Sequence, residues 1–263
     1  MRSSLAVMII CVLAVMSCVP RDQVRNENIN TEETRNLASF DEVSVGNSIK
    51  LTLEKGNSNT ARIETSDVDT EEVVIKVSGS SLNIYMKKGS FGFWGTTSWR
   101  GTIEVYLTYT ENLKTISASN SSSVKSNTLM ESDEFYIRAS NSATIDLKVN
   151  AEELELNISN SGRMRLDATT ENLEAKITNS GKLSLNGETN SQKIYISNSG
   201  YFSGYDMQSE RVDATIRNSG SAEVSVSKKL VADASNSGKI YYKGNPDKLQ
   251  ADTGNGAKVE RAD

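Results

Sequence analysis

The carboxylates Glu155 and Glu174, at equivalent places in successive units of a sequence repeat, are the best candidates for catalysis in a chain of 263 residues without histidine. The lack of histidine excludes a His general base, a Ser-His-Asp or Cys-His nucleophile and any zinc site that needs imidazole. If each repeat forms one stacked coil, the two backbones lie roughly 4.8 Å apart, and acids about 5 Å apart can hydrolyse a glycoside with retention. Lys193 and Asp213 continue the same row, so a solvated strip of mixed charge is the favoured interpretation.

The sequence also predicts no cofactor, no metal site and no nucleic-acid partner. Its two cysteines, Cys11 and Cys18, both lie near the start, so the body has no thiol for a disulfide, a metal cluster or redox work. The 29 Lys and Arg residues against 34 Asp and Glu give a net charge of −5. A surface with this balance is a poor partner for phosphate backbones.

Residues 1–17 are typical of an export signal, because Arg2 precedes an apolar run too short to span a bilayer. The run ends in Val-Met-Ser-Cys, which resembles the lipobox of bacterial lipoproteins. We therefore expect Cys18 to carry a lipid anchor to the outer membrane, on its periplasmic or its surface side. The alternative is ordinary signal-peptidase cleavage nearby, with Cys18 an incidental thiol. Residues 18–39 are polar without sustained apolar periodicity, which predicts a tether.

A glycine-punctuated aromatic segment, residues 88–101, holds both tryptophans and two of the five phenylalanines. Aromatic faces in such a loop can stack on sugar rings or grip another protein, so ligand contact is one interpretation. The favoured interpretation is a hydrophobic lid over an open end or side of the fold. The residues that ligand contact would involve are Phe91, Phe93, Trp94 and Trp99.

A short tandem repeat dominates the rest of the chain. Each unit carries the tetrapeptide Ser-Asn-Ser-Gly or a close variant, and its asparagine recurs about every 19 residues, ending with a decayed copy at Asn255. Tandem repetition at such a period indicates a solenoid. The seven regular asparagines are Asn120, Asn141, Asn160, Asn179, Asn198, Asn218 and Asn236.

Within each unit, apolar residues alternate with polar ones, as in the stretch from Leu154 to Ala168. A period of two predicts strands, and the absence of three-and-four spacing excludes a helical solenoid. One short unit cannot bury its apolar face alone, so the units must stack as parallel coils. Since parallel crossovers favour right-handedness, residues 111–263 are predicted to form a right-handed parallel β-helix, an all-β solenoid.

The repeated asparagines share the parity of the apolar residues, which places them inside the column. Stacked carboxamides could then hydrogen-bond from coil to coil as an internal Asn ladder with a structural role. The Ser and Gly that follow suit a bend, Gly because it accepts positive φ. A row of ligand-binding amides or a calcium site is the weaker alternative, since calcium-binding β-rolls use a repeat with Asp where this one has none.

Residues 40–110 show the same alternation with a looser period and form an irregular N-terminal region. Gly46-Asn47-Ser48 is interpreted as a worn first copy of the turn. Because a solenoid needs its open end closed against water and edge pairing, this region either caps the column or begins it with irregular coils. The sequence leaves that choice open.

Several of these motifs together resemble the putative auto-transporter adhesin family with the head GIN domain. They are the lipobox-like leader, Phe-Asp-x-Val-x-Val at 40–45, Leu-x-Ile-Tyr at 82–85, the Trp-bearing insertion and the tandem Asn-Ser-Gly coils. The likeness runs from Phe40 to the end of the chain. It implies a secreted or surface-anchored β-helical protein of the kind found in Bacteroidetes, called an adhesin, with no catalytic residues to carry over. Ser122 and Ala143 replace the turn glycine, which puts the conformation of those two turns in question.

The expected function is therefore that of a non-enzymatic, lipid-anchored cell-envelope protein. Its β-helix would act as an adhesive, structural or binding module for glycan or protein. The alternative is a polysaccharide-active enzyme, a hydrolase or a lyase, on the same scaffold. Repeat units this short leave little room for the long groove-lining loops that a lyase would want.

Overall fold

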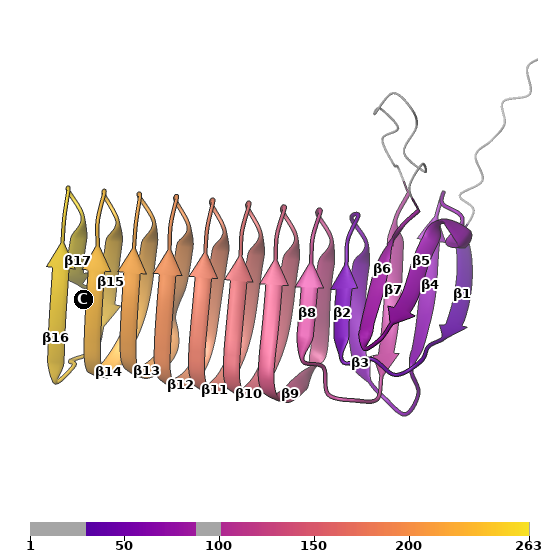
Figure 1. The fold of residues 1–263 in the computed structure, drawn as a ribbon, viewed down its shortest axis with the longest axis horizontal. Helices are drawn as coiled ribbons and strands as arrows, with labels where there is room; N and C mark the ends of the chain where they lie inside the picture. The colour runs from indigo at the N-terminus through magenta and orange to yellow at the C-terminus, as the bar shows by residue number, and fades with distance from the viewer. Residues whose placement is uncertain (1–29, 88–100, 263) are drawn as a thin grey trace, which may run out of the picture.

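The computed structural model describes residues 30–87 and 101–262, and within them the chain is almost entirely β-structure with one 3₁₀ turn, η1 (Thr70–Glu72). A long right-handed column follows a less regular N-terminal region (Figure 1). The N-terminal strands are β1 (Asn30–Asn36), β2 (Glu42–Val45), β3 (Lys50–Lys55), β4 (Thr60–Ser66), β5 (Val73–Ser78), β6 (Ser81–Met86) and β7 (Ile103–Tyr109). The column strands are β8 (Thr115–Ala118), β9 (Ser123–Ala139), β10 (Thr144–Ile158), β11 (Arg163–Ile177), β12 (Lys182–Ile196), β13 (Tyr201–Ile216), β14 (Ser221–Ala234), β15 (Lys239–Lys243), β16 (Lys248–Thr253) and β17 (Lys258–Arg261).

Each regular coil of the column is one long strand that bends back on itself, followed by a tight Asn-Ser turn. In Figure 1, the chain descends behind, bends at the bottom, rises in front and crosses the turn at the top, advancing from right to left. Neighbouring coils pair in parallel, and the β10–β11 register joins Ile145 to Met164 and Ile158 to Ile177, with the same offset along the chain at both ends. The predicted right-handed parallel β-helix is confirmed, with a flat two-sheet cross-section.

The core is a stack of alternate side chains from every coil. Leu154, Leu156 and Ile158 are at most 1% exposed, while the intervening Glu155 is exposed. Their neighbours in the next coil are Leu173, Ala175 and Ile177. Because strand side chains alternate between faces and the register is kept, like residues stack from coil to coil. The interior is therefore a continuous apolar column, as the period of two predicted.

The Asn-Ser turns are built from two consecutive residues with positive φ, for example Asn160 at 47° and Ser161 at 64°. The Ser161 backbone N–H donates to the Asn179 carbonyl oxygen at 3.1 Å, which ties each turn to the next. The carboxamides form the predicted ladder, each Nδ2 donating to the Oδ1 of the preceding turn at 3.0 to 3.1 Å from Asn141 through Asn255.

The prediction that this ladder lies inside the column is wrong, because the asparagines are exposed at the outer corner. Two left-handed residues in succession reverse the chain, so the alternation of faces does not continue through the turn as it does along a strand. Asparagine suits this position because it tolerates the left-handed conformation better than most residues. The ladder is thus a ridge of hydrogen-bonded amides along one edge.

The glycine after each turn has a different role from the one predicted. Gly162, Gly181 and their equivalents do not have positive φ. They are buried instead, where a Cβ would meet core atoms of the same and the preceding coil. Ser122 and Ala143 leave their turns in the same left-handed conformation as the others, so the departure from glycine does not alter the turn.

The position of Asn179 in the ridge leads to a graded stability prediction. Asn179→Ala should lower the free energy of unfolding by about 2 kcal/mol, because alanine resists positive φ and both ladder bonds are lost. Asn179→Gly, which keeps the conformation and loses only the bonds, should cost about 1 kcal/mol. Asn255→Gly should cost less still, since Asn255 makes one ladder bond. Urea unfolding checks this order, and equal losses for alanine and glycine at residue 179 would contradict it.

The N-terminal region both begins and caps the column, so each of the two alternatives holds for part of it. Asn47 and Ser48 have φ of 58° and 59° and form a turn like the later ones, with β2 and β3 stacked in parallel on β8 and β9. On the other side β6 and β7 continue the parallel stacking, and β4 and β5 then close it with antiparallel pairing. The change to antiparallel strands ends the growth of the coil stack.

The predicted tether, residues 18–39, is wrong at its C-terminal part, because β1 pairs antiparallel with β4 at the edge of the cap. Its inward-facing side chains are polar but satisfied. Arg35 pairs with Glu33 and donates to the carbonyl oxygens of Val73 at 2.7 Å and Thr70 at 3.0 Å. The Arg35 hydrogen bond holds the pKa of Glu33 below its usual value. Apolar periodicity could not reveal a strand held by polar contacts.

Candidate functional site

The predicted acid pair Glu155 and Glu174 does lie on adjacent coils, since the two residues are register partners. Both side chains are exposed on the flat front sheet. The next partner in the row is Lys193, whose Nζ lies 3.3 Å from Glu174 Oε2. This pairing makes the row a solvated strip of mixed charge. The two glutamates line an open hollow of about 560 Å³ together with Lys193 and Lys114, so lysines accompany the carboxylates there.

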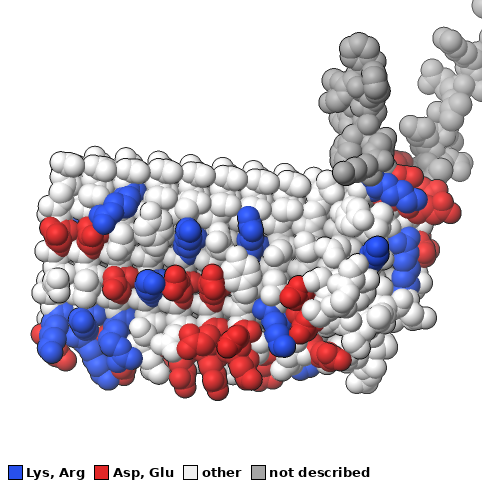
Figure 2. Space-filling view, viewed as in Figure 1, with Lys and Arg blue, Asp and Glu red and all other residues white. Residues whose placement is uncertain are grey.

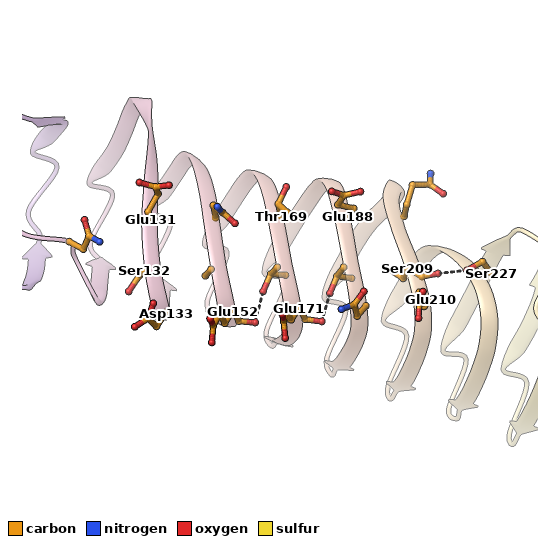
Figure 3. A pocket seen from close by; sticks show the side chains of 17 residues that line it. Glu131, Ser132, Asp133, Glu152, Thr169, Glu171, Glu188, Ser209, Glu210 and Ser227 are labelled. Atoms are coloured by element: carbon orange, nitrogen blue, oxygen red, sulfur yellow. Dashed lines mark hydrogen bonds between the residues drawn. The ribbon is translucent and has the colours of Figure 1, made fainter.

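A groove runs instead along the bottom of the column, where the long strands bend (Figure 3). Its volume is about 750 Å³, and equivalent residues of β9 to β14 line it. We call it the bend groove. It extends across successive coils, so any ligand that fills it must itself be extended along the column axis.

The floor of the bend groove is a row of small side chains, Ser132, Ala151, Thr170, Thr189 and Ser209, stacked in register. Thr170 Oγ1 lies 3.1 Å from the Glu152 carbonyl oxygen and 3.0 Å from the Asn172 carbonyl oxygen, and Thr189 repeats both contacts one coil later. These hydroxyls are buried and serve the backbone carbonyls that the bend leaves without ladder partners. The floor is therefore structural.

The walls of the bend groove carry its charge. Figure 3 shows Glu131, Thr169 and Glu188 on one side of the floor and Asp133, Glu152, Glu171 and Glu210 on the other. On the second wall, Asp133, Glu152 and Glu171 occupy equivalent places in three successive coils, roughly 4.8 Å apart. On the first wall, Asn150 and Thr169 separate Glu131 from Glu188 in the register row. The six carboxylates of the two walls are Glu131, Asp133, Glu152, Glu171, Glu188 and Glu210.

Most of this negative charge is uncompensated. Within the described residues, Glu210 is the wall carboxylate that forms ion pairs, with Lys228 at 2.6 Å and Arg211 at 3.2 Å. The Lys228 hydrogen bond lowers the pKa of Glu210. Figure 2 shows the acidic side chains gathered along the lower edge and basic ones at the C-terminal end of the same edge, where Arg211, Lys229 and Lys248 stack in register. The edge thus changes sign along the column.

The chemistry that the bend groove supports is recognition. Rows of exposed carboxylates accept hydrogen bonds from hydroxyls and attract cationic groups. No group of three or more acidic or thiol side chains in the described part of the chain is placed to hold a metal ion. The groove escaped the sequence analysis because its residues are far apart in the chain, although Asp133, Glu152 and Glu171 do follow the spacing of the repeat.

Comparison with known proteins identifies the family. The sequence profile described as putative auto-transporter adhesin, head GIN domain, matches residues 39–183 and residues 148–246. The chain belongs to this adhesin family. No curated protein matches it.

Solved structures share the fold of this adhesin-family protein at low sequence identity. A putative lipid binding protein from Parabacteroides distasonis ATCC 8503 has a TM-score of 0.79 and 21% identity. Two putative adhesins, from Parabacteroides merdae ATCC 43184 and from P. distasonis ATCC 8503, have TM-scores of 0.78 and 0.76, both at 20% identity. Each comparison covers 90% of this chain and 98% of the other. At this identity the likeness concerns the fold.

Several residues that the sequence analysis singled out lie outside the described residues of this adhesin-family protein. They are the export signal, the lipidation candidate Cys18 and the four aromatic residues Phe91, Phe93, Trp94 and Trp99. Among the described residues, no helix has the length and hydrophobicity that a membrane crossing requires. The seven ladder asparagines are described in full, and their side chains contact one another at the turns.

Proposed function

We propose that this protein is a non-enzymatic adhesin of the cell envelope that binds an extended polymer along its bend groove. Membership of the adhesin family supports an exported, adhesin-like protein. The leader and the lipobox-like Val-Met-Ser-Cys support an anchor at Cys18 in the outer membrane. In this proposal the lipid holds the column at the membrane, and the cap and the solenoid present the groove to a partner.

The observation that carries the proposal is the group of six carboxylates in the bend groove, of which, among the described residues, Glu210 alone forms ion pairs. Isolated surface charges contribute little to binding, whereas several like charges in one concave surface focus the potential and attract an oppositely charged partner. The groove runs along the coils, so its partner is a chain with repeated basic groups, either a lysine-rich or arginine-rich protein segment or an amino-sugar polymer. Electrostatic complementarity of this kind sets both specificity and association rate.

A retention experiment with matched variants tests the proposal. The mature protein would be passed over immobilised polylysine, chitosan and neutral mannan at low and high salt. Retention on a basic polymer, weakened by salt, is expected for the unmodified protein. The pair of substitutions Glu152→Gln and Glu171→Gln should weaken it about tenfold. The pair Glu155→Gln and Glu174→Gln removes the same charge from the flat sheet and should leave retention unchanged.

The same experiment separates binding from catalysis. The eluted polysaccharides would be assayed for new reducing ends and for unsaturated ends, the products of a hydrolase and a lyase. Retention without cleavage is the expected result. Equal weakening by the groove pair and the flat-sheet pair would contradict the groove as the binding surface. Polysaccharide turnover abolished by Glu155→Gln or Glu174→Gln would overturn the non-enzymatic assignment.

The anchor needs a test of its own. Mass spectrometry of the mature N-terminus should find a peptide that begins at Cys18 and carries acyl chains. Cys18→Ala should release the protein from the membrane fraction, because a single residue with several chains provides the whole anchor. An unmodified N-terminus at another residue would contradict lipid anchoring and leave the groove proposal intact.

A further inference from the structure

One coil of the column differs from its neighbours on the sheet opposite Glu155 and Glu174. The coil from Asn198 to Asn218 is longer than the one before it, and the pairing of β13 with β14 shifts register between Gly204 and Gln208. Tyr205 lies in this irregular stretch. An irregularity of this kind bends the strand locally and re-aims a side chain, and such bulges are frequent beside functional sites.

A group of aromatic and polar side chains surrounds this irregularity. We call it the tyrosine patch, and it consists of Tyr201, Ser203, Tyr205, Glu223, Tyr241 and Lys243. Ser203, Glu223 and Tyr241 are register partners on three successive coils. Ser203 Oγ lies 3.4 Å from Glu223 Oε2. Lys243 Nζ lies 4.6 Å from the centre of the Tyr205 ring.

The phenols of Tyr201 and Tyr205 are close to the Glu223 carboxylate, which disfavours the loss of their protons. Burial, followed by a hydrogen bond with Glu223, raises the pKa of Tyr201. Burial, and then the charges of Glu223 and the neighbouring tyrosines, raise the pKa of Tyr205. Tyr201, Tyr205 and Tyr241 are half-buried, so each remains partly exposed at the surface.

The equivalent places in earlier coils are unlike the patch. The register row through Tyr201 holds Arg163 and Lys182, and the row through Ser203 holds Arg165 and Ser184. Those positions belong to a solvated surface of mixed charge. The role of such a surface in a solenoid is solubility. Four of the nine tyrosines of the chain fall between residues 201 and 242, which concentrates aromatic residues on the coils of the patch.

We propose that the tyrosine patch binds a neutral saccharide, as a second site separate from the bend groove. The exposed ring parts provide apolar faces for the C–H side of a pyranose. The Glu223 carboxylate can accept hydrogen bonds from a vicinal diol, while Lys243 and the phenol of Tyr205 donate to sugar oxygens. The hydroxyls of Tyr201 and Ser203 already donate to Glu223 and can accept from the sugar.

A protein partner fits the patch less well. A stable protein interface buries about 800 Å² on each side around an apolar, well-packed centre. The exposed large hydrophobic side chains of the described residues are Tyr85, Leu129, Tyr195 and Leu249, and none of them belongs to the patch. Each tyrosine of the patch carries a hydroxyl beside a charged group. A docked apolar side chain would leave these hydrogen-bonding groups without partners.

Saturation-transfer NMR of the mature protein with maltohexaose, cellohexaose and mannohexaose tests the proposal. At least one of these neutral probes should bind, and Tyr205→Ala should raise its Kd about tenfold. Glu223→Gln should raise the Kd several-fold, because an amide oxygen accepts hydrogen bonds less strongly than a carboxylate. Tyr205→Phe should have an intermediate effect on the Kd. Tyr195→Ala, which removes an exposed tyrosine from the other sheet, is the matched control and should change nothing. Thermal unfolding of each variant verifies that it is folded.

The outcomes are separable from those of the groove proposal. Failure of all three probes to bind the unmodified protein would overturn the saccharide assignment, even if basic polymers are still retained by the groove. Saccharide binding that Tyr205→Ala leaves unchanged and Glu152→Gln weakens would move the sugar to the groove and overturn the patch. Loss of a protein contact in Tyr205→Ala, without saccharide binding, would replace the sugar by a protein partner.

Discussion

Gly187→Ala is expected to lower the free energy of unfolding by about 3–5 kcal/mol, from a strained backbone plus an overpacked contact. Gly187 lies within β12 with φ of +121°, a conformation that side chains rarely adopt. A Cβ on this residue would also lie much closer to the carbonyl oxygen of Ala168, in the preceding coil, than van der Waals contact allows. That oxygen is part of the backbone of a paired strand, so neither partner can move without breaking the coil stack.

Gly79→Ala is the control for backbone strain alone. Gly79 also has positive φ, 64°, but a Cβ on it would meet nothing within 4 Å. Its substitution should cost about 1 kcal/mol, which is the cost of the left-handed conformation. Urea unfolding of both variants measures the difference. Equal effects would show that the contact with Ala168 relaxes freely, and would contradict the view that stacked coils hold one another rigidly.

Much of the column follows from two features of the sequence. The alternation of apolar residues requires strands, and the nearly constant interval of the repeat requires that each strand stack in register on its own copy. The pairs Leu154 with Leu173 and Ile158 with Ile177 are read directly from that interval and occur in the structure. Parallel pairing then leaves a single way to bury both apolar faces.

The turn could not be predicted in the same way, because its geometry depends on φ and not on hydrophobicity. Extending the alternation of inward and outward side chains through Asn160 predicted that its carboxamide lies inside the column. The left-handed φ at Asn160 and Ser161 instead places it at the outer corner. The ladder itself survives this change, since stacking alone brings equivalent side chains together. Its contribution to stability is smaller at an exposed corner, where water competes for the same hydrogen bonds.

The candidate site was hidden for a related reason. The bend groove depends on where each coil turns at the bottom, and there no glycine or proline marks the bend in every coil. Its floor residues Thr170 and Thr189 have no counterpart motif, although they recur at the spacing of the repeat. Acidic residues on a strand surface are usually solvated. Both acid pairs line hollows of the folded column, but the hollow of Glu155 and Glu174 includes lysines, whereas the lining of the bend groove around Glu152 and Glu171 does not. Shape is a property of the folded coil stack.

Gly220 and Ile196 explain why glycine follows the turn in most coils and not in all. A Cβ on Gly220 would lie 2.7 Å from Ile196 Cγ2 and 3.1 Å from Ile216 Cγ2. The space that glycine leaves is thus filled by β-branched isoleucines of its own and the preceding coil. Where the turn carries Ala143 instead, the corresponding core residues are Ala139 and Ala118. A larger residue after the turn is thus accompanied by smaller residues in the core beside it, which keeps the packing density constant.

A double-mutant cycle at Gly220 and Ile196 should therefore show strong coupling. Gly220→Ala alone should cost about 2 kcal/mol by overpacking, and Ile196→Ala alone about 3 kcal/mol by leaving a cavity. Together they should cost at least about 1 kcal/mol less than the sum, because the new methyl group enters the space that the isoleucine leaves. Gly220→Ala combined with Ile145→Ala, a buried isoleucine several coils away, should be additive. Additivity in both pairs would mean that the isoleucine methyl groups are not what requires glycine at this position.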